Sequence, residues 1–199
     1  LTNKTLTDAV AITNSVTGQI IPGKTEGTNF TGSLLVGHAT TGTLNAASNN
    51  TGVGIAALDA LTSGDSNTAI GYQSGTKITT GGNNTAIGET SLFLNTSGSS
   101  NTAMGHQSLY ALASGSNNTA VGRVALSSTT GDNNVGIGKS AGSNITSGDG
   151  NVIIGVNTNA DSATGDRQLK ISGNDGSTAT TWISGDSSGN VTVAGTLTT

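Results

Sequence analysis

The 199-residue chain contains no cysteine, few aromatic residues and little charge. Without cysteine it can have neither a disulfide framework nor thiolate chemistry. Aromatic residues are 3% and charged residues 9% of the chain, too few to build a single globular core from large side chains. Such a composition could indicate disorder, but disorder usually comes with high net charge and no periodicity, and the net charge here is only −4.

Two further absences limit the partners. No apolar run approaches the roughly 18–20 residues needed to span a bilayer, and no basic cluster is present to bind nucleic acid. We therefore expect neither membrane insertion nor nucleic-acid binding. The chain begins at Leu1 without a signal-like segment. We expect it to be a piece of a longer polypeptide or a processed product.

The chain does contain a strict internal repeat of five residues: Asn, a small or β-branched residue, a small residue, an aliphatic residue and Gly. The seven best copies begin at Asn50, Asn67, Asn84, Asn101, Asn118, Asn134 and Asn151. Successive starts are 17, 17, 17, 17, 16 and 17 residues apart, and residues 33–37 and 168–172 are worn terminal copies. A fixed period of this length predicts a stacked array in which each unit contacts its neighbours.

Each five-residue unit predicts a short strand, because Thr, Val and Ile favour extended backbone. A turn is expected three residues before each Asn, where Gly would take a positive φ. These glycines are Gly64, Gly81, Gly98, Gly115, Gly131, Gly148 and Gly165. Asp, Ser or Asn follows most of them and can bond the turn backbone.

A second apolar site follows each strand at a fixed offset. It is occupied by Leu58, Leu92, Leu109 and Leu126, or three residues later by Ile78 and Ile145 where Gly75 and Gly142 take the leucine position. Two apolar sites and two turn regions predict a flattened roll with two short strands per coil. A three-sided helix would show an aliphatic residue every six positions, which is absent.

Stacking in register places identical residues about 4.8 Å apart. The Asn column then predicts a ladder in which each side-chain amide donates to one neighbour and accepts from the other. A polar binding stripe is the functional alternative for this column.

The two faces of the predicted strand differ in size. The aliphatic residue at the fourth position shares a face with Thr or Val at the second, while the small third residue and the final Gly share the other. Neither face is charged, which is typical of strands buried on both sides. A roll covers only one face, so we expect the other to pack against two identical copies around an axis.

The position directly after the strand varies, which indicates exposure to solvent. It is occupied by His38, Ile55, Tyr72, Glu89, His106, Arg123, Lys139 and Val156. The two histidines are four coils apart, about 19 Å, so one chain cannot use both on one metal ion; a ring of three His106 side chains in an oligomer is the alternative. Any receptor contact here is expected at exposed positions such as Tyr72, His106, Tyr110 and Arg123, without a defined ligand-binding site.

We expect no enzymatic activity, cofactor or metal site. Asp132, Asp149 and Asp166 fall at one corner, where carboxylates in a row could hold a cation, but a solvated turn is the favoured interpretation because the calcium-binding nonapeptide pattern is missing. No pair of acids stands out for glycoside cleavage. Neither histidine has neighbours that suggest a catalytic triad.

The strand motif resembles the head repeats of trimeric autotransporter adhesins. It is more similar to the Asn-Thr-Ala-Ile-Gly repeats of bacteriophage tail fibres, in which Thr-Ser-Gly or Thr-Thr-Gly loops are frequent. Matching loops occupy residues 62–64, 79–81, 96–98, 129–131 and 146–148. The resemblance covers about residues 33–172 and implies an all-β fold: a left-handed parallel β-roll, or solenoid, of 17-residue coils in a homotrimer.

The flanks also resemble phage fibres. Residues 1–31 look like a connecting segment, and residues 182–197 are similar to the stretch that precedes a self-cleaving chaperone; by themselves they predict two short strands in a hairpin. We divide the chain into an N-terminal connector or docking segment at residues 1–31, a repeat roll of about eight to nine coils at residues 32–172, and a C-terminal β segment at residues 173–199.

The expected function is that of a rigid rod in a trimeric phage tail or capsid-associated fibre, located extracellularly on the virion and involved in host attachment. Its expected partners are two further copies, other virion proteins and a host surface receptor. Three alternatives stay open: a bacterial adhesin head, an ice-binding solenoid, which would need outward Thr pairs in every coil, and a tailspike hydrolase.

Overall fold

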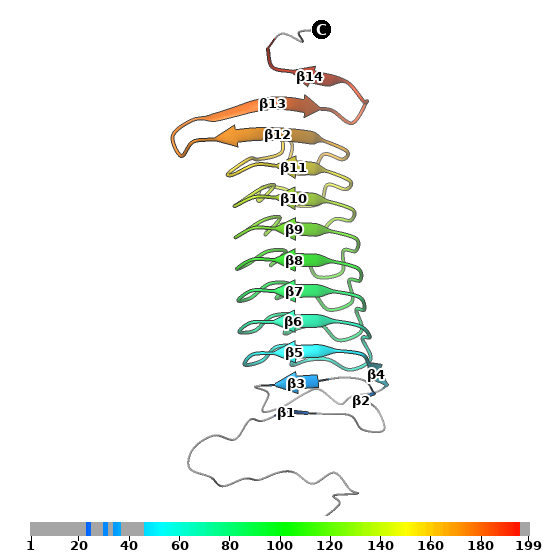
Figure 1. The fold of residues 1–199 in the computed structure, drawn as a ribbon. Helices are drawn as coiled ribbons and strands as arrows, with labels where there is room; N and C mark the ends of the chain where they lie inside the picture. The colour runs from blue at the N-terminus through cyan, green and yellow to red at the C-terminus, as the bar shows by residue number, and fades with distance from the viewer. Residues whose placement is uncertain (1–22, 25–29, 32–33, 37–45, 196–199) are drawn as a thin grey trace, which may run out of the picture.

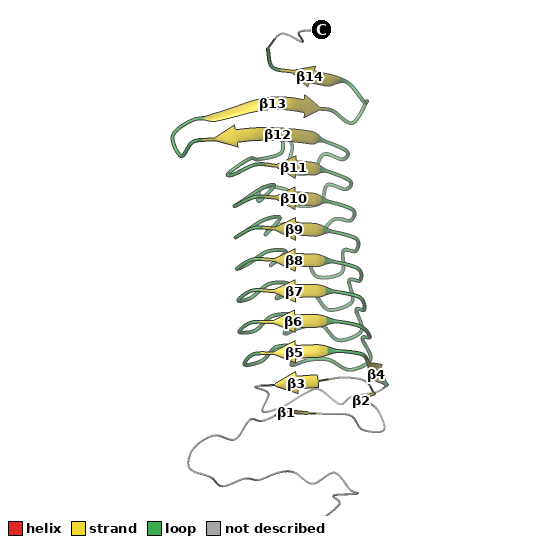
Figure 2. Cartoon of the chain, in the orientation of Figure 1, coloured by secondary structure: helices red, strands yellow, loops and turns green. Residues whose placement is uncertain are grey.

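The computed structural model describes residues 23–24, 30–31, 34–36 and 46–195. Most of the expected connector at residues 1–31 therefore lies outside the described residues. The described chain is all β, without a helix, and forms a parallel β-solenoid of about seven coils (Figures 1 and 2). The repeated strands are β3 (Leu34–Val36), β5 (Thr51–Val53), β6 (Thr68–Ile70), β7 (Thr85–Ile87), β8 (Thr102–Met104), β9 (Thr119–Val121), β10 (Val135–Ile137) and β11 (Val152–Ile154).

The strands stack with equivalent positions paired. Ala69 in β6 pairs with Ala86 in β7, for example, and flanking residues pair in the same register. The shortened 16-residue coil keeps this register, since Thr119 pairs with Val135. The worn copies join the stack as well: β3 pairs in parallel with β5, and β12 (Leu169–Asn174) with β11. At the N-terminal end, β1 (Gly23–Lys24) pairs with β3, and β2 (Phe30–Thr31) with β4 (Ala47–Ser48).

The core lies between the small face of the strands and the second apolar site. The third motif position is buried in every coil from β5 to β11, and so are Leu58, Leu92, Leu109 and Leu126. The predicted compensation is confirmed: Ile78 and Ile145 are buried where glycine takes the leucine position. A Cβ on Gly75 would lie only 2.9 Å from Cδ1 of Ile78, so the isoleucine fills the vacated volume.

The prediction of two strands per coil is wrong, because each full coil from β5 to β11 has one strand and returns through turns. The buried leucines have positive φ, 57° at Leu58 and 49° at Leu92, which breaks an extended path. The return half still bonds to the next coil, as in the 3.1 Å bond from Leu58 N–H to the Ser74 carbonyl. A leucine in left-handed backbone carries an energetic penalty that the stacked environment must offset. Because leucine rarely adopts this conformation, the amino-acid sequence does not signal the turn.

The predicted turn three residues before each Asn is present, but the predicted positive φ of its glycines is wrong. The glycines three residues before each Asn do not have positive φ; the residue directly before each Asn does, with 58° at Ser66 and 59° at Asn83. Glycine is needed at the corner because the coils touch there: a Cβ on Gly81 would lie 2.3 Å from the Gly98 carbonyl oxygen. The constraint is contact with the next coil.

The predicted asparagine ladder is confirmed. Asn84 Nδ2 donates to Oδ1 of Asn67 at 3.0 Å and to the Gly98 carbonyl at 2.9 Å, while the Asn84 backbone N–H donates to the same Oδ1. The seven Asn side chains are buried, and the ladder ends on Gln168, whose Nε2 donates to Asn151 Oδ1 at 3.0 Å. The ladder is an internal structural element, so it offers no polar binding stripe.

The C-terminal end turns from parallel to antiparallel pairing. β12 pairs with β13 (Ala179–Gly185), and β13 with β14 (Val191–Val193). The expected hairpin at the end of the chain is confirmed as β13–β14. The β12–β13 pairing was not expected, and β12 crosses the expected domain boundary between residues 172 and 173.

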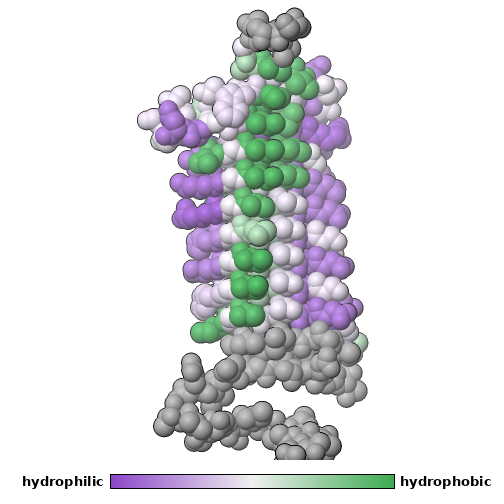
Figure 3. Space-filling view, in the orientation of Figure 1, coloured by the Kyte–Doolittle hydropathy of each residue, from purple (hydrophilic) through white to green (hydrophobic). Residues whose placement is uncertain are grey.

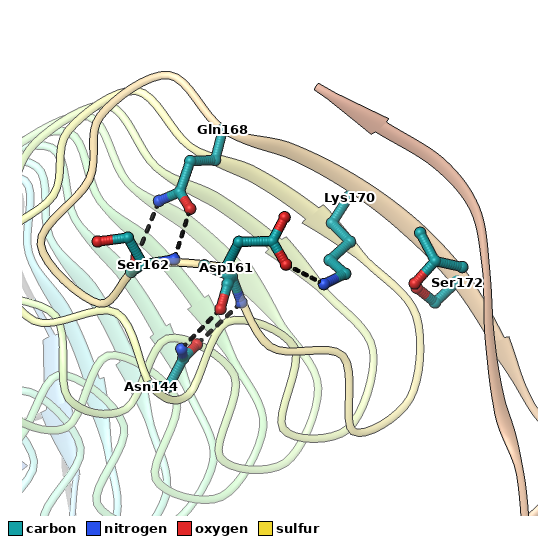
Figure 4. A network of polar contacts seen from close by, with 8 residues as sticks. Asn144, Asp161, Ser162, Gln168, Lys170 and Ser172 are labelled. Carbon is teal, nitrogen blue, oxygen red and sulfur yellow. Dashed lines mark hydrogen bonds and ion pairs between the residues drawn. The ribbon is translucent and has the colours of Figure 1, made fainter. Parts of the chain in front are cut away.

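A polar network closes the last coil, where no further coil follows (Figure 4). Gln168 Oε1 accepts from Ser162 N–H at 2.7 Å, and Asn144 exchanges two 2.9 Å hydrogen bonds with the backbone of Ala160. Lys170 stands at the inward third position and pairs with Asp161. Such a polar terminal layer is what a repeat array needs to end without exposing its core.

Candidate functional site

The bulky face of the strands points outward and forms an uncharged stripe along the roll (Figure 3). We define the outer stripe as the second and fourth motif positions of β5–β11. At the fourth position Val53, Ile70, Met104 and Ile137 are exposed by 39–41%, and Ile87, Val121 and Ile154 are half-buried. At the second position five threonines are followed by Val135 and Val152, all half-buried. A soluble monomer rarely leaves such a continuous apolar strip on its surface.

The stripe becomes more apolar toward the C-terminal end. The change from Thr to Val at the second position doubles the aliphatic column at β10 and β11. Leu169 and Ile171 continue both columns on β12, and Ile183 pairs with Ile171 on the same side of β13. The broadened green area in Figure 3 follows this change.

Variable side chains flank the stripe, as expected. At the position after the strand, Ile55, Tyr72, Glu89, Arg123, Lys139 and Val156 are exposed. His106 is only half-buried, and its Nδ1 is buried without a hydrogen-bond partner. His38 lies outside the described residues.

The four expected receptor contacts do not form one cluster. Tyr72, His106 and Arg123 share the column after the strand, whereas Tyr110 lies in another column, four residues beyond His106. The Tyr110 ring is half-buried and stacks on Phe93 of the preceding coil, with ring centroids 5.1 Å apart. This pair therefore contributes to coil stacking.

The predicted aspartate stack is present at the corner. Oδ1 of Asp149 accepts from the Asp132 N–H at 2.7 Å, and Oδ1 of Asp166 from the Asp149 N–H at 2.9 Å. One oxygen of each of these carboxylates thus joins successive coils. Across the described residues, no three His, Asp or Glu side chains lie together as potential metal ligands.

Two hollows lie at the C-terminal end. One, of about 290 Å³, separates the last coil from the β13–β14 turn and includes Gln168 and Asp186. The other surrounds Trp182, which is exposed by 54%. Sequence reasoning did not select Trp182 as a candidate; its being the only tryptophan of the chain is the signal that could have drawn attention to it.

Comparisons with known proteins assign no family. No family model matches the chain, and no significant match is found among curated proteins or solved structures. The described residues include no helix able to cross a membrane. The outer stripe and the C-terminal strands are therefore the features from which a function can be argued.

Proposed function

We propose that this chain is the rod segment of a homotrimeric attachment fibre of a bacteriophage, with a left-handed roll and a non-enzymatic role. The observation that carries the proposal is the outer stripe: an uncharged column of aliphatic residues beside a column of Thr and Val, in register over seven coils, on the outside of a roll whose core is already filled. Burial of this column would be favourable by about 25 cal/mol per Å² of apolar surface removed from water.

Three copies are the arrangement that we propose to cover the stripe. Cyclic symmetry closes an assembly without leaving an open interface, and an axis parallel to the roll lets each coil meet the same coil of its neighbours. In-register side chains along the stripe suit such an arrangement, because every coil would then repeat one contact. The resulting rod would be roughly 40 Å long for eight or nine coils spaced by about 4.8 Å.

The proposed function is mechanical. Backbone and side-chain hydrogen bonds link every coil to the next, which suits a rod that holds its ends at a fixed separation. A trimer would present any surface feature three times, so weak contacts with a host surface would gain through effective concentration.

The test is the mass of the particle in solution. Light scattering on the purified chain is expected to give three times the chain mass of 19.3 kDa. The double variant Ile70→Lys/Met104→Lys places charge in the stripe and is expected to yield monomers. Glu89→Lys is the matched control, since it changes charge at an exposed position beside the stripe and should remain trimeric. A wild-type monomer at micromolar concentration would contradict the proposal.

A bacterial adhesin head would use the same trimer, so the parent gene decides between these two. A downstream coiled coil with an outer-membrane anchor indicates the adhesin. A neighbouring terminase or portal gene indicates the phage fibre.

Ice binding is a second candidate, favoured by one observation. The outward threonines Thr51, Thr68, Thr85, Thr102 and Thr119 are in register beside the aliphatic column. This function needs the stripe open to water, whereas the trimer covers it. A monomer with thermal hysteresis that is lost on Thr85→Lys would support ice binding over the fibre.

A further inference from the structure

The β12–β13 hairpin projects beyond the flank of the roll (Figure 1). β12 pairs with β11 only through Leu169–Ile171, so the rest of the hairpin extends past the coil beneath it. Trp182 lies where this part begins, in the bulge between Ile183, which pairs with Ile171, and Thr181, which pairs with Ser172, and it is exposed by 54%. A large aromatic ring left open to solvent at a projecting element calls for an explanation.

The backbone of β12 is shaped to receive the indole ring. A Cβ on Gly173 would lie 2.3 Å from Cζ2 and 2.8 Å from Cη2 of Trp182, so no other residue fits beneath the ring. Glycine weakens a strand interior and often marks a close approach to the backbone. Gly173 therefore holds part of the ring against the sheet, while the 54% exposure leaves the remainder accessible.

Polar groups surround the ring. Asn174, Asp175, Thr178 and Thr180 line the same open hollow with Gly173 and Trp182. Their side chains supply amide, carboxylate and hydroxyl groups, which include both hydrogen-bond donors and acceptors. Asp175, Thr178 and Thr180 are exposed in the single chain. Gly173 follows Leu169 and Ile171 on the outward face of β12, so the site requires the proposed trimer to leave this projecting end uncovered.

The Asp175 carboxylate is held in place by its own turn. Its Oδ1 accepts from Thr178 N–H at 2.8 Å and from Ser177 N–H at 2.9 Å. The bond from Thr178, followed by that from Ser177, lowers the pKa of this carboxyl below its ordinary value. Oδ2 makes no recorded hydrogen bond in the described structure and can accept one from a ligand.

We propose that Trp182 and the polar groups around it form a saccharide-binding site. A sugar ring has an apolar C–H face that would lie on the open indole surface and a rim of hydroxyl groups that would bond to Asp175, Asn174 and the threonines. A cationic ligand would use the indole ring and the Asp175 carboxylate but leave the amide and hydroxyl groups without a role, so a saccharide matches the whole lining better. The site gives the proposed attachment fibre its ligand class, and in that respect it rests on the proposed function.

The single tryptophan makes the site directly observable. The wild-type chain is titrated with methyl α-glucoside, methyl β-galactoside, N-acetylglucosamine and rhamnose while Trp182 fluorescence is recorded. A saturable change with at least one sugar is expected, and choline chloride should not displace it. If no sugar gives a saturable change, or if choline binds more tightly, the assignment is wrong.

Variants are compared by saturation-transfer NMR, which does not need the tryptophan. Trp182→Ala is expected to weaken binding of the responding sugar by about tenfold or more, and Asp175→Asn to weaken it less. Asp186→Asn is the matched control, because Asp186 caps the next turn in a similar way but lies outside the Trp182 hollow. Circular dichroism checks that each variant is folded.

Light scattering and sugar binding on the same samples test the trimer and the saccharide site separately. A trimer whose sugar binding is unchanged by Trp182→Ala overturns the site and leaves the fibre. A monomer that binds sugar through Trp182 overturns the trimer and leaves the site.

Discussion

At the residue scale, the same residue type is required at different positions of the repeat for different physical reasons. Gly71 ends a strand with a φ of 131°, a region that other residues rarely adopt, whereas Gly81 has no positive φ and is required by contact with the next coil. The asparagines differ in the same way. Those of the ladder have partners on both Nδ2 and Oδ1, but Asn95 occupies a core column with Leu61 and Leu112, and neither its Nδ2 nor its Oδ1 has a partner.

Asn95→Leu is therefore expected to stabilise the chain. It removes a buried amide whose unmet hydrogen bonds cost about 1–3 kcal/mol and installs the residue found at the equivalent place in other coils. Urea unfolding followed by circular dichroism measures the change in free energy. Leu112→Asn, the reciprocal change one coil further on, should destabilise the chain. Equal or lower stability of Asn95→Leu would show that the amide has a partner.

At the element scale, one coil is stabilised mainly by what it exchanges with its neighbours. Short three-residue strands contribute little alone, and the ladder adds side-chain bonds to the backbone bonds of the sheet. Asn101 donates to Asn84 and to the Gly115 carbonyl, and its Oδ1 accepts two bonds from Asn118. Loss of the Asn101 amide leaves the Gly115 carbonyl and the Asn118 backbone N–H without these partners, whereas Asn84 Oδ1 keeps the bond from the Asn101 backbone N–H.

Asn101→Ala is expected to lower the free energy of unfolding by about 3 kcal/mol or more, because several buried donors and acceptors lose their partners together. The exposed Asn159→Ala is the control and should change it by less than about 0.5 kcal/mol. Both are measured by urea unfolding. A loss at Asn101 no larger than at Asn159 would show that the ladder adds no stability.

The two C-terminal turns predict an acid response. The pKa of Asp186 is lowered, mainly by the Asn190 side chain, and that of Asp175 by the backbone N–H of Thr178. A folded-state pKa below the unfolded one stabilises the fold above the unfolded value, and this contribution is lost as pH falls through the folded value. β12–β14 should therefore loosen in acid.

Trp182 fluorescence during an acid titration reports this transition. The double variant Asp175→Asn/Asp186→Asn is expected to lack the pH dependence, since neither turn retains a titrating carboxyl. A transition of unchanged midpoint and amplitude in the double variant would assign it to other groups.

At the scale of the whole molecule, the solenoid behaves as a one-dimensional array. Each described repeat strand is hydrogen-bonded only to the strands before and after it, so stability is close to a sum over coils and their interfaces. The C-terminal antiparallel strands and the polar network around Gln168 end the array.

Removal of residues 84–100 should leave a folded, shorter roll. The deletion takes out one full period of 17 residues and joins Asn83 to Asn101, which recreates the original Asn–Asn junction. Circular dichroism should keep its β spectrum, and small-angle scattering should give a rod shorter by about 4.8 Å. Removal of residues 84–92 alone shifts the register by half a coil and should prevent folding. Failure of the full-period deletion would mean that the coils are not interchangeable.

Much of the fold could be predicted because repetition turns a long-range problem into a local one. The period placed Asn67 over Asn50, and side-chain amides stacked in register can each donate to one neighbour and accept from the other. The conformation of the second half of each coil was not predicted, because leucine at position 58 gives no indication of left-handed backbone. The candidate sites were predicted less well: stacking of Tyr110 on Phe93 and the approach of Trp182 to Gly173 depend on how the coil or hairpin folds over.

The sequence by itself determined the stacking, because identical residues at a constant spacing satisfy each other's hydrogen bonds only when the coils are in register. Only the tertiary structure decided which face of the strand is hidden. Alanine at the third position allows the leucine half of the coil to pack closely, so the small face turns inward and the aliphatic face remains on the surface. That choice depends on the width of the roll, a property of the closed coil that no single repeat contains.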